Sequence, residues 1–225
     1  MTDTLIPVVA IDGPSGSGKG TIARRVAERL GYHVLDSGAL YRLIAISAGK
    51  RGVRLDDSEP VARIAHDLDV HFESNDDGSE RILLDGDDVT LTVRKESTGA
   101  GASTVAAIPA VRAALLDRQR AFQQAPGLVA DGRDMGTHVF PSALVKIFLT
   151  ASAEERARRR HKQLKDKGMD VSLAALSRDI EDRDRRDSER SVAPLKPAEN
   201  ARILDSSGLS IEAVTNTVIE WVAEL

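Results

Sequence analysis

A glycine-rich segment near the amino end, GPSGSGKGT at positions 13–21, has the composition of a loop that binds phosphate. Its glycines let the backbone turn so that successive N–H groups converge on phosphate oxygens. The lysine adds a mobile positive charge, and the helix expected after it adds the partial positive charge of its amino end. The apolar run 7–12 supplies the strand that this motif requires. We therefore predict nucleotide phosphate contacts from Gly13, Pro14, Ser15, Gly16, Ser17, Gly18, Lys19, Gly20 and Thr21.

Gly20 stands where such loops usually carry the serine or threonine that binds the metal ion. Because Mg²⁺ keeps several of its waters and needs few protein ligands, the missing hydroxyl predicts Mg²⁺ held by nucleotide oxygens and water. No direct protein ligand is expected, with Thr21 and Asp131 nearby. The chain also has no Asn-Lys-x-Asp motif, which weakens the case for a GTPase.

The segment ADGRDMGT, at 130–137, follows another apolar run. The carboxyl ends of parallel strands form the edge where ligands bind, so this segment should lie beside the phosphate loop. Asp131 is placed to orient metal-bound water. Arg133 and Asp134 form a charge pair in which one member can hold a phosphate and the other a base amino group. The alternative is that DGRD is only a turn.

The segment LDSGALYR, at 35–42, ends the second apolar run. We expect its Asp36, Ser37 and Arg42 at the same edge of the sheet. Ser37 has two compatible interpretations, a contact to a bound molecule and a cap for the helix that follows.

Two clusters of arginine occur in the last third of the chain. Arg183, Asp187 and Arg190 have the spacing i, i+4 and i+7, which predicts one helical face. Arg156, Arg159 and Arg160 form the second cluster. Either cluster alone is typical of exposed ion pairs that contribute little to stability. Beside a phosphate loop, however, such charges can align and neutralise a phosphoryl group in transfer.

Five short apolar runs bounded by turn residues predict the strands that position these side chains: 7–12, 32–37, 127–132, 143–151 and 201–207. Segments with helical period lie between them, which predicts an α/β fold with a five-stranded parallel sheet flanked by helices. The alternation breaks at about 58–103, where one helical segment precedes the pieces DVHFES, RILLDG and DVTLTV. We interpret this stretch as an inserted domain with a small antiparallel meander.

The composition excludes several classes of protein. The 225 residues include no cysteine, so disulfides, thiolate catalysis and cysteine metal sites are excluded. No apolar run approaches the length of a membrane span, and the amino end lacks a secretory pattern, so we expect a cytoplasmic protein without a membrane partner. The net charge of −4 argues against a nucleic-acid partner.

Taken in order, IDGPSGSGKGT, LDSGALYR, DGRDMGT, VKIFL, ERARRR, RDRRDSER and VAPL make the whole chain resemble the bacterial cytidylate kinases, a family of nucleoside monophosphate kinases. The resemblance implies a P-loop kinase core at 1–57 and 104–225, a short arginine-rich lid at about 156–170, and an acceptor-binding domain at 58–103. It also implies a monomer that transfers phosphate from ATP, with Mg²⁺, to CMP or dCMP. The family positions that hold the acceptor nucleotide correspond to Ser37, Arg42, Ser103, Arg112, Arg133, Asp134, Arg183 and Asp187.

Within this resemblance, Arg42 and Arg133 are assigned to the acceptor phosphate, and Arg183 and Asp187 to the sugar. Ser103, Arg112 and Asp134 are assigned to the cytosine edge.

We expect direct in-line transfer, with Lys19 on the outer phosphates of ATP and with Arg159 and Arg190 neutralising the transition state. Asp131 completes the catalytic set, and the insertion and the lid are expected to close over both substrates. The main alternative is a kinase of the same core acting on UMP, AMP or a non-nucleotide metabolite. A non-catalytic module switched by nucleotide is the alternative from another class.

Overall fold

The computed structural model describes residues 6–74, 80–166, 168 and 170–224. The chain divides into two compact units. The core unit comprises Met1–Asp36 and Gln119–Leu225, and the second unit comprises Ser37–Arg118. The second unit is thus larger than the predicted insertion 58–103, because it also includes the helix that follows the second strand and most of the helix that leads back to the core.

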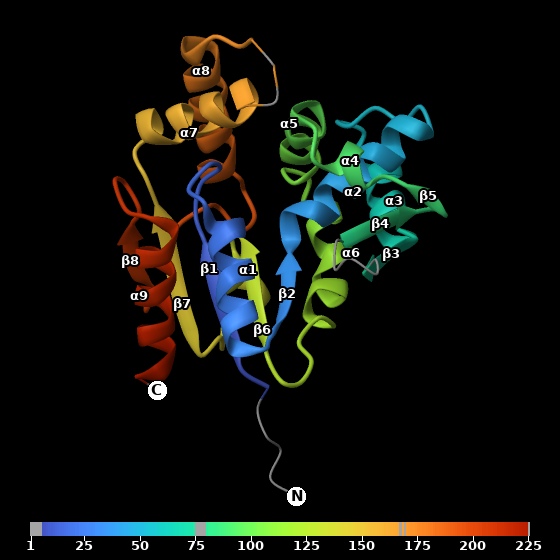
Figure 1. Ribbon diagram of the computed structural model, residues 1–225. Helices are drawn as coiled ribbons and strands as arrows, with labels where there is room; N and C mark the ends of the chain where they lie inside the picture. The colour runs from blue at the N-terminus through green and yellow to red at the C-terminus, as the bar shows by residue number, and fades with distance from the viewer. Residues whose placement is uncertain (1–5, 75–79, 167, 169, 225) are drawn as a thin grey trace, which may run out of the picture. The chain divides into compact units, whose positions relative to one another are not determined.

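The core unit is built on a parallel sheet of five strands in the order β2-β6-β1-β7-β8 (Figure 1). The strands are β1 Val8–Asp12, β2 His33–Asp36, β6 Leu128–Gly132, β7 Val145–Thr150 and β8 Arg202–Asp205. All five predicted strands are confirmed. In the register, Asp12 pairs with Gly132 and Asp36 with Asp131, so the polar residues that end these strands share one edge of the sheet.

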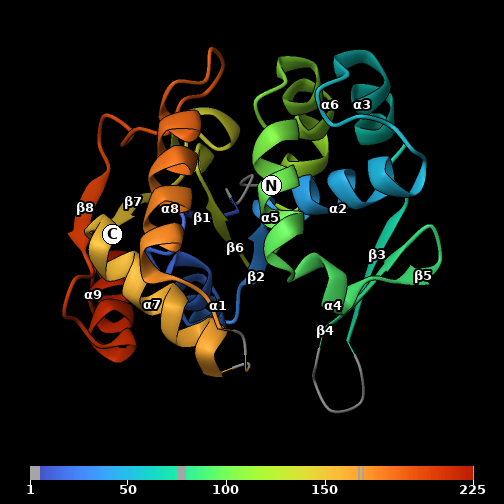
Figure 2. The ribbon, with the colours of Figure 1, turned by 90° about the horizontal axis from the view of Figure 1, so that it is seen from above.

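The helices of the core unit are α1 Lys19–Leu30, α7 Ala153–Asp166, α8 Leu173–Ser188 and α9 Ile211–Ala223, with a short π-helix, η1, at Met135–Val139. Helices α1 and α9 cover the same face of the sheet (Figure 1). Val26 of α1 and Val218 of α9 are fully buried in one apolar cluster with Ile11 of β1. Helices α7 and α8 pack against each other (Figure 2).

The second unit contains α2 Ser37–Lys50, α3 Ser58–His66, α4 Thr90–Val93, α5 Glu96–Val105 and most of α6 Pro109–Arg120. Its antiparallel sheet has the order β3-β4-β5, with β3 Val70–Ser74, β4 Glu80–Leu84 and β5 Asp87–Asp88. No single helix of the described chain is long and apolar enough to cross a membrane, and only α5 with α6, bent by 104° between them, reach that length and composition together.

The third strand of the predicted meander, DVTLTV at 88–93, is wrong beyond its first residue. Strand β5 ends at Asp88, and DVTLTV continues as the helical turn α4. The Asp88 carboxylate accepts hydrogen bonds from the backbone N–H of Thr90, at 3.0 Å, and from its hydroxyl, at 2.7 Å. The Thr90 hydroxyl oxygen also accepts from the backbone N–H of Ile82, at 2.9 Å. These side-chain bonds take the place of strand pairing, so the chain turns after Asp88.

Candidate nucleotide site

The phosphate loop joins β1 to α1 and has the backbone that the sequence predicts. Gly16 and Gly18 have φ values of 80° and 90°, in the left-handed region that favours glycine. Lys19 is the first residue of α1, and its ammonium donates a hydrogen bond to the Pro14 carbonyl at 3.0 Å. The lysine therefore closes the loop on itself, with its charged end held at the loop.

Burial is the largest influence on the charge of Lys19. It lowers the pKa of the ammonium to about 7, and the guanidinium groups of Arg133 and Arg183 lower it further, whereas Asp131 and Asp187 raise it. A lysine in this state gains its full charge when anionic phosphate arrives. Since all five side chains belong to the core unit, the influences on this pKa show that the structure brings them together.

Gly20 lies so close to Asp131 that there is no space for a side chain. A Cβ atom at position 20 would lie 2.9 Å from Asp131 Oδ2, closer than real Cβ contacts. A serine or threonine there would push the carboxylate away. The missing hydroxyl of the loop is thus explained by the acidic residue of the neighbouring strand.

Replacing Gly20 with serine is expected to displace Asp131 and to lower the free energy of unfolding by about 1–3 kcal/mol, the usual cost of overpacking. Gly49→Ser is the matched control, because Gly49 is also helical and a Cβ there meets nothing within 4 Å. Thermal unfolding and turnover of the two variants test this expectation. Equal stability and activity of both variants would contradict the steric explanation.

Asp131 combines burial with a free acceptor atom. Burial raises the pKa of its carboxyl to about 6, Lys19 opposes this, and Asp36 adds to it. Its Oδ1 atom is buried and has no hydrogen-bond partner in the described part of the chain. A carboxylate oxygen that needs a donor fits a metal-bound water, so Asp131 suits a Mg²⁺ that arrives with its nucleotide.

Arg133 pairs with a residue from a distant part of the sequence. Its Nε donates to Asp187 Oδ2 at 2.9 Å, and both side chains are largely buried. Burial raises the pKa of the Asp187 carboxyl, but Arg133, Arg190 and Arg183 outweigh burial and hold the pKa below its usual value. The guanidinium and its carboxylate are therefore both ionised and held in a fixed geometry.

The expectation that Arg190 lies on the same helical face is wrong, because α8 ends at Ser188. In a longer α8 the Asp187 carbonyl would accept a backbone N–H of the next helical turn. Instead it accepts hydrogen bonds from Arg190 Nε and from the Leu195 N–H. Arg190 nevertheless stays next to Asp187, with 3.7 Å between its Nη2 and Asp187 Oδ1.

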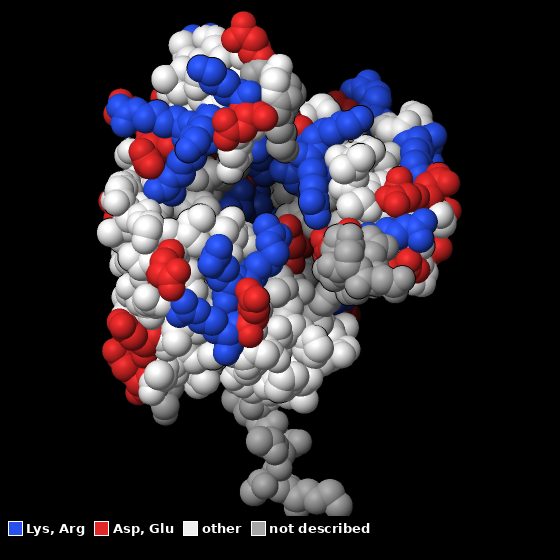
Figure 3. Space-filling view, in the orientation of Figure 1, with Lys and Arg blue, Asp and Glu red and all other residues white. Residues whose placement is uncertain are grey.

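Two arginines of α7 brace the phosphate loop from outside. Arg156 is buried and donates to the Ser15 carbonyl at 3.0 Å and to Asp184 Oδ1 at 3.1 Å. Arg159 donates to the Ser206 carbonyl at 2.7 Å and lies 3.4 Å from the Ser17 carbonyl. Arg160 instead contacts Gln163 at 3.2 Å on the same helix. Lys and Arg side chains, interspersed with acidic ones, gather on the surface over α7 and α8 (Figure 3).

Asp134 and Arg183, like Arg133 and Asp187, belong to the core unit, whereas the other four predicted acceptor residues belong to the second unit. Arg42 of α2 donates to the carbonyls of Val93 and Lys95 at 3.0 and 2.9 Å. A Cβ at Gly99 would lie 2.7 Å from Arg42 Nη2, so the glycine makes room for the guanidinium. Ser37 and Ser103 are buried. Arg112 is buried too and lies over the Tyr41 ring, 5.8 Å from its centroid.

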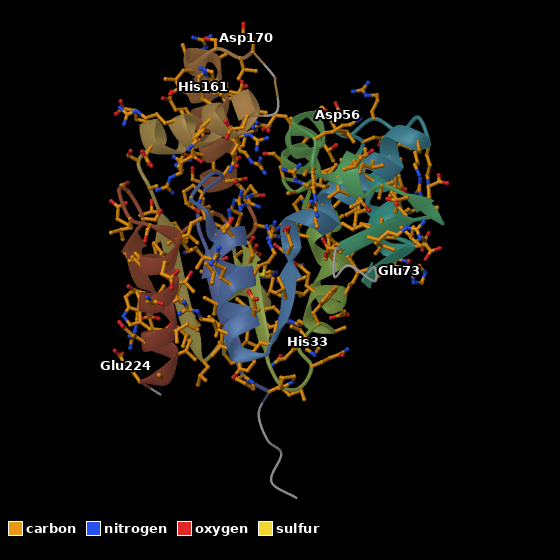
Figure 4. The ribbon with its side chains drawn as sticks, viewed as in Figure 1. His33, Asp56, Glu73, His161, Asp170 and Glu224 are labelled. Atoms are coloured by element: carbon orange, nitrogen blue, oxygen red, sulfur yellow. The ribbon has the colours of Figure 1, made fainter. Side chains whose placement is uncertain are left out.

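The described residues contain no group of three or more His, Cys, Asp or Glu side chains that could hold a metal ion. His33 at the amino end of β2 and His161 on α7 lie at opposite ends of the core unit (Figure 4).

Comparison with known proteins decides the family. The family model described as cytidylate kinase matches residues 9–224. The chain belongs to the cytidylate kinase family. A cytidylate kinase of Pseudomonas paraeruginosa is 62% identical over 215 residues, which cover 95% of this chain and 94% of that protein. A cytidylate kinase of Stutzerimonas stutzeri is 60% identical over 220 residues, 97% of this chain and 96% of that protein.

The likeness to solved structures concerns the fold alone. An uncharacterized protein from Eubacterium ventriosum superposes with a TM-score of 0.51 at 10% identity, over 97% of this chain and 99% of that one. The α/β architecture of this family member is therefore found at very low sequence identity.

Three residues at the site were missed by the sequence analysis. Asp12 accepts backbone hydrogen bonds from Met135 and Gly136, Asp184 pairs with Arg156, and Ser206 holds Arg159. Asp12 carried a signal, because it is the only charged residue in the apolar run 7–12 and ends it. The other two partners are distant in sequence from the arginines that they contact, and no local pattern pairs them.

ATP binding is expected to take up protons in proportion to the neutral fraction of Lys19. Because the pKa of Lys19 is about 7 and the phosphates raise it, uptake by this group should approach about one proton at pH 8 and vanish near pH 6. Calorimetry of ATP binding in buffers of different ionisation enthalpy measures it. Lys19→Met is the reference, and equal uptake at pH 8 by this variant and the wild type would contradict the assignment.

Proposed function

We propose that this chain transfers the γ-phosphoryl group of ATP to the phosphate of CMP, and of dCMP, forming ADP and CDP or dCDP. The observation that supports this most is the grouping of Lys19, Asp131 and the Arg133–Asp187 pair in one unit with the phosphate loop. This grouping offers positive charge to two sets of phosphates. Membership of the cytidylate kinase family supplies the identity of the acceptor.

In the proposed reaction, an oxygen of the CMP phosphate attacks the γ-phosphorus while the bond to the β–γ bridging oxygen breaks. The electron pair of that bond leaves with ADP. Phosphoryl transfer leaves little covalent chemistry to the protein, so the chain contributes alignment and positive charge. Lys19 holds the outer phosphates, and the backbone N–H groups of the phosphate loop hold the rest.

No general base is needed, because a phosphate monoester has a second pKa of about 6 and is largely ionised near neutral pH. Mg²⁺ bound with ATP would neutralise charge on the β- and γ-phosphates. Asp131, with its free buried oxygen, would accept a hydrogen bond from water bound to that ion. Thr21, two residues after Lys19, is the nearby hydroxyl in this assignment.

For the acceptor, we assign Arg42 and Arg133 to the phosphate of CMP, and Arg183 and Asp187 to its sugar. Ser103, Arg112 and Asp134 are assigned to the cytosine edge, with Ser37 beside the phosphate. Arg159 and Arg190 are assigned to the transferring group. These assignments rest on the family resemblance of single positions, and the burial of Ser103 and Arg112 agrees with a role as specific contacts.

The proposal includes action as a monomer in the cytoplasm, because every role is assigned to one chain and both substrates are small molecules. No nucleic acid or membrane partner is part of it.

The acceptor is tested by turnover with ATP and a panel of CMP, dCMP, UMP, AMP and non-nucleotide hydroxy acids. We expect kcat/KM to be highest for CMP or dCMP, because a carboxylate such as Asp134 accepts from the exocyclic amine that UMP lacks. A preference for UMP, AMP or a hydroxy acid would contradict the assigned acceptor. Binding of ATP without acceptor-dependent ADP release would favour a nucleotide-switched binding module.

A further inference from the structure

Asp12 is a buried carboxylate to which none of the roles above is assigned. It ends β1 and directly precedes Gly13 of the phosphate loop, and only 4% of its surface is exposed. Its Oδ1 accepts the backbone N–H of Met135 at 2.8 Å, and its Oδ2 accepts the N–H of Gly136 at 2.8 Å. Both carboxylate oxygens are thus used on two successive amides of another segment.

These amides begin η1, which directly follows Arg133 and Asp134. The first N–H groups of a helix have no partner within it, and Asp12 provides one for two of them. In the sheet register, Asp12 is also the partner of Gly132. One residue therefore fixes the chain on both sides of the two-residue turn that carries Arg133 and Asp134.

Stability alone does not explain a carboxylate at this position. Burial raises the pKa of Asp12 to about 7, the two backbone N–H groups oppose this rise, and Asp134 and Asp131 add to it. An ionised group in this place therefore costs folding free energy. The hydrogen-bonding geometry explains the carboxylate of Asp12 better. A carboxylate presents two acceptor oxygens to the two N–H groups, whereas asparagine presents one acceptor and one donor.

We propose that Asp12 is a positioning residue for the acceptor, which sets Arg133 and Asp134 relative to the phosphate loop through its two hydrogen bonds. The inference rests on the proposed function only in naming CMP as the acceptor. Since Asp12 and the loop share a strand junction, this carboxylate links the donor half of the site to the acceptor half within the core unit.

The test is Asp12→Asn, alone and combined with Arg133→Ala. Losing one charge-assisted hydrogen bond is expected to lower kcat/KM for CMP about tenfold and to change the dissociation constant of ATP less than about twofold. In the Arg133→Ala background the same substitution should cost clearly less than about tenfold, because only the positioning of Asp134 is then left to lose and coupled residues are not additive. Equal losses for ATP and CMP, or additive losses in the double variant, would overturn the proposal.

Two further measurements keep failure of the variant separate from failure of the proposed function. The first is amide hydrogen exchange of Asp12→Asn without substrate, which should accelerate at Met135 and Gly136 and stay unchanged at 13–21. Unchanged exchange at 135–136 would overturn the proposal, whatever the acceptor is. If Asp12→Asn does not fold, Gly136→Ala is the second variant. A Cβ there would lie 3.2 Å from two carbons of Lys146, which is tight, and 3.4 Å from Asp12 Oδ2, so the added methyl group pushes on the segment that carries the Gly136 N–H. This variant should raise KM for CMP more than KM for ATP, and the reverse order would overturn the proposal.

Thr215→Val is the control for loss of a buried polar group. Thr215 is 1% exposed, and its hydroxyl donates to the Ile211 carbonyl within α9. Turnover with CMP and the affinity for ATP should both stay within about twofold of the wild type. A loss of CMP turnover in this control as large as in Asp12→Asn would overturn the proposal, because any buried polar residue would then have the same effect.

Discussion

Lys19→Ala is expected to lower kcat about 10²- to 10³-fold, the usual effect of removing one preorganised charge from a developing transition state. Lys19 is the lysine of the phosphate loop, and its ammonium is held at the Pro14 carbonyl, 3.0 Å away. Alanine keeps the helix, so the fold should remain. Steady-state turnover together with thermal unfolding measures the effect.

Lys50→Ala is the matched control, since the ammonium of Lys50 also donates to an oxygen, that of the Asp87 carboxylate at 2.8 Å, but on the surface of the second unit. Its removal should leave kcat within about twofold, as is usual for exposed pairs. Near-normal turnover of a folded Lys19→Ala protein would contradict the assignment of the phosphate loop.

Arg133→Ala is expected to lower kcat/KM for CMP by about 10²-fold or more, with a much smaller change in the KM for ATP. The guanidinium is held by Asp187 at 2.9 Å, and the proposed role places it on the acceptor phosphate. Lysine at this position should recover little, because an ammonium lacks the planar fork of arginine. Initial rates with each substrate varied in turn separate the two effects.

Arg29→Ala serves as the control, because Arg29 pairs with Glu212 at 2.9 Å with both side chains exposed. Since Asp187 loses the guanidinium that donates to it at 2.9 Å in Arg133→Ala, thermal unfolding is measured on the same samples. A selective loss of ATP affinity with normal use of CMP would show that Arg133 belongs to the donor side.

The parallel sheet and the phosphate loop were predictable from the sequence because their signals are local. Five apolar runs bounded by turn residues became the five strands, and Gly16 and Gly18 of the loop adopt the positive φ values that this motif needs. The carboxyl edge of the sheet then had to gather the residues that end those strands.

Contacts between distant segments were not predictable. The space at Gly20 is taken by Asp131, more than a hundred positions along the chain, so the sequence showed the glycine but not its cause. Arg133 was expected to pair with its neighbour Asp134, and the structure gives it Asp187. Local side-chain hydrogen bonds also ended two elements earlier than the sequence pattern predicted. The Asp88 carboxylate turns the chain after β5, and the Arg190 side chain helps to end α8.

The most direct test of the account is product analysis with the wild-type protein, ATP and CMP, followed by ³¹P NMR. We expect the phosphorus signals of CDP and ADP to grow at equal rates, with no inorganic phosphate, because the γ-phosphoryl group passes directly to the acceptor. Release of inorganic phosphate without CDP, or no ADP when CMP is added, would contradict the account.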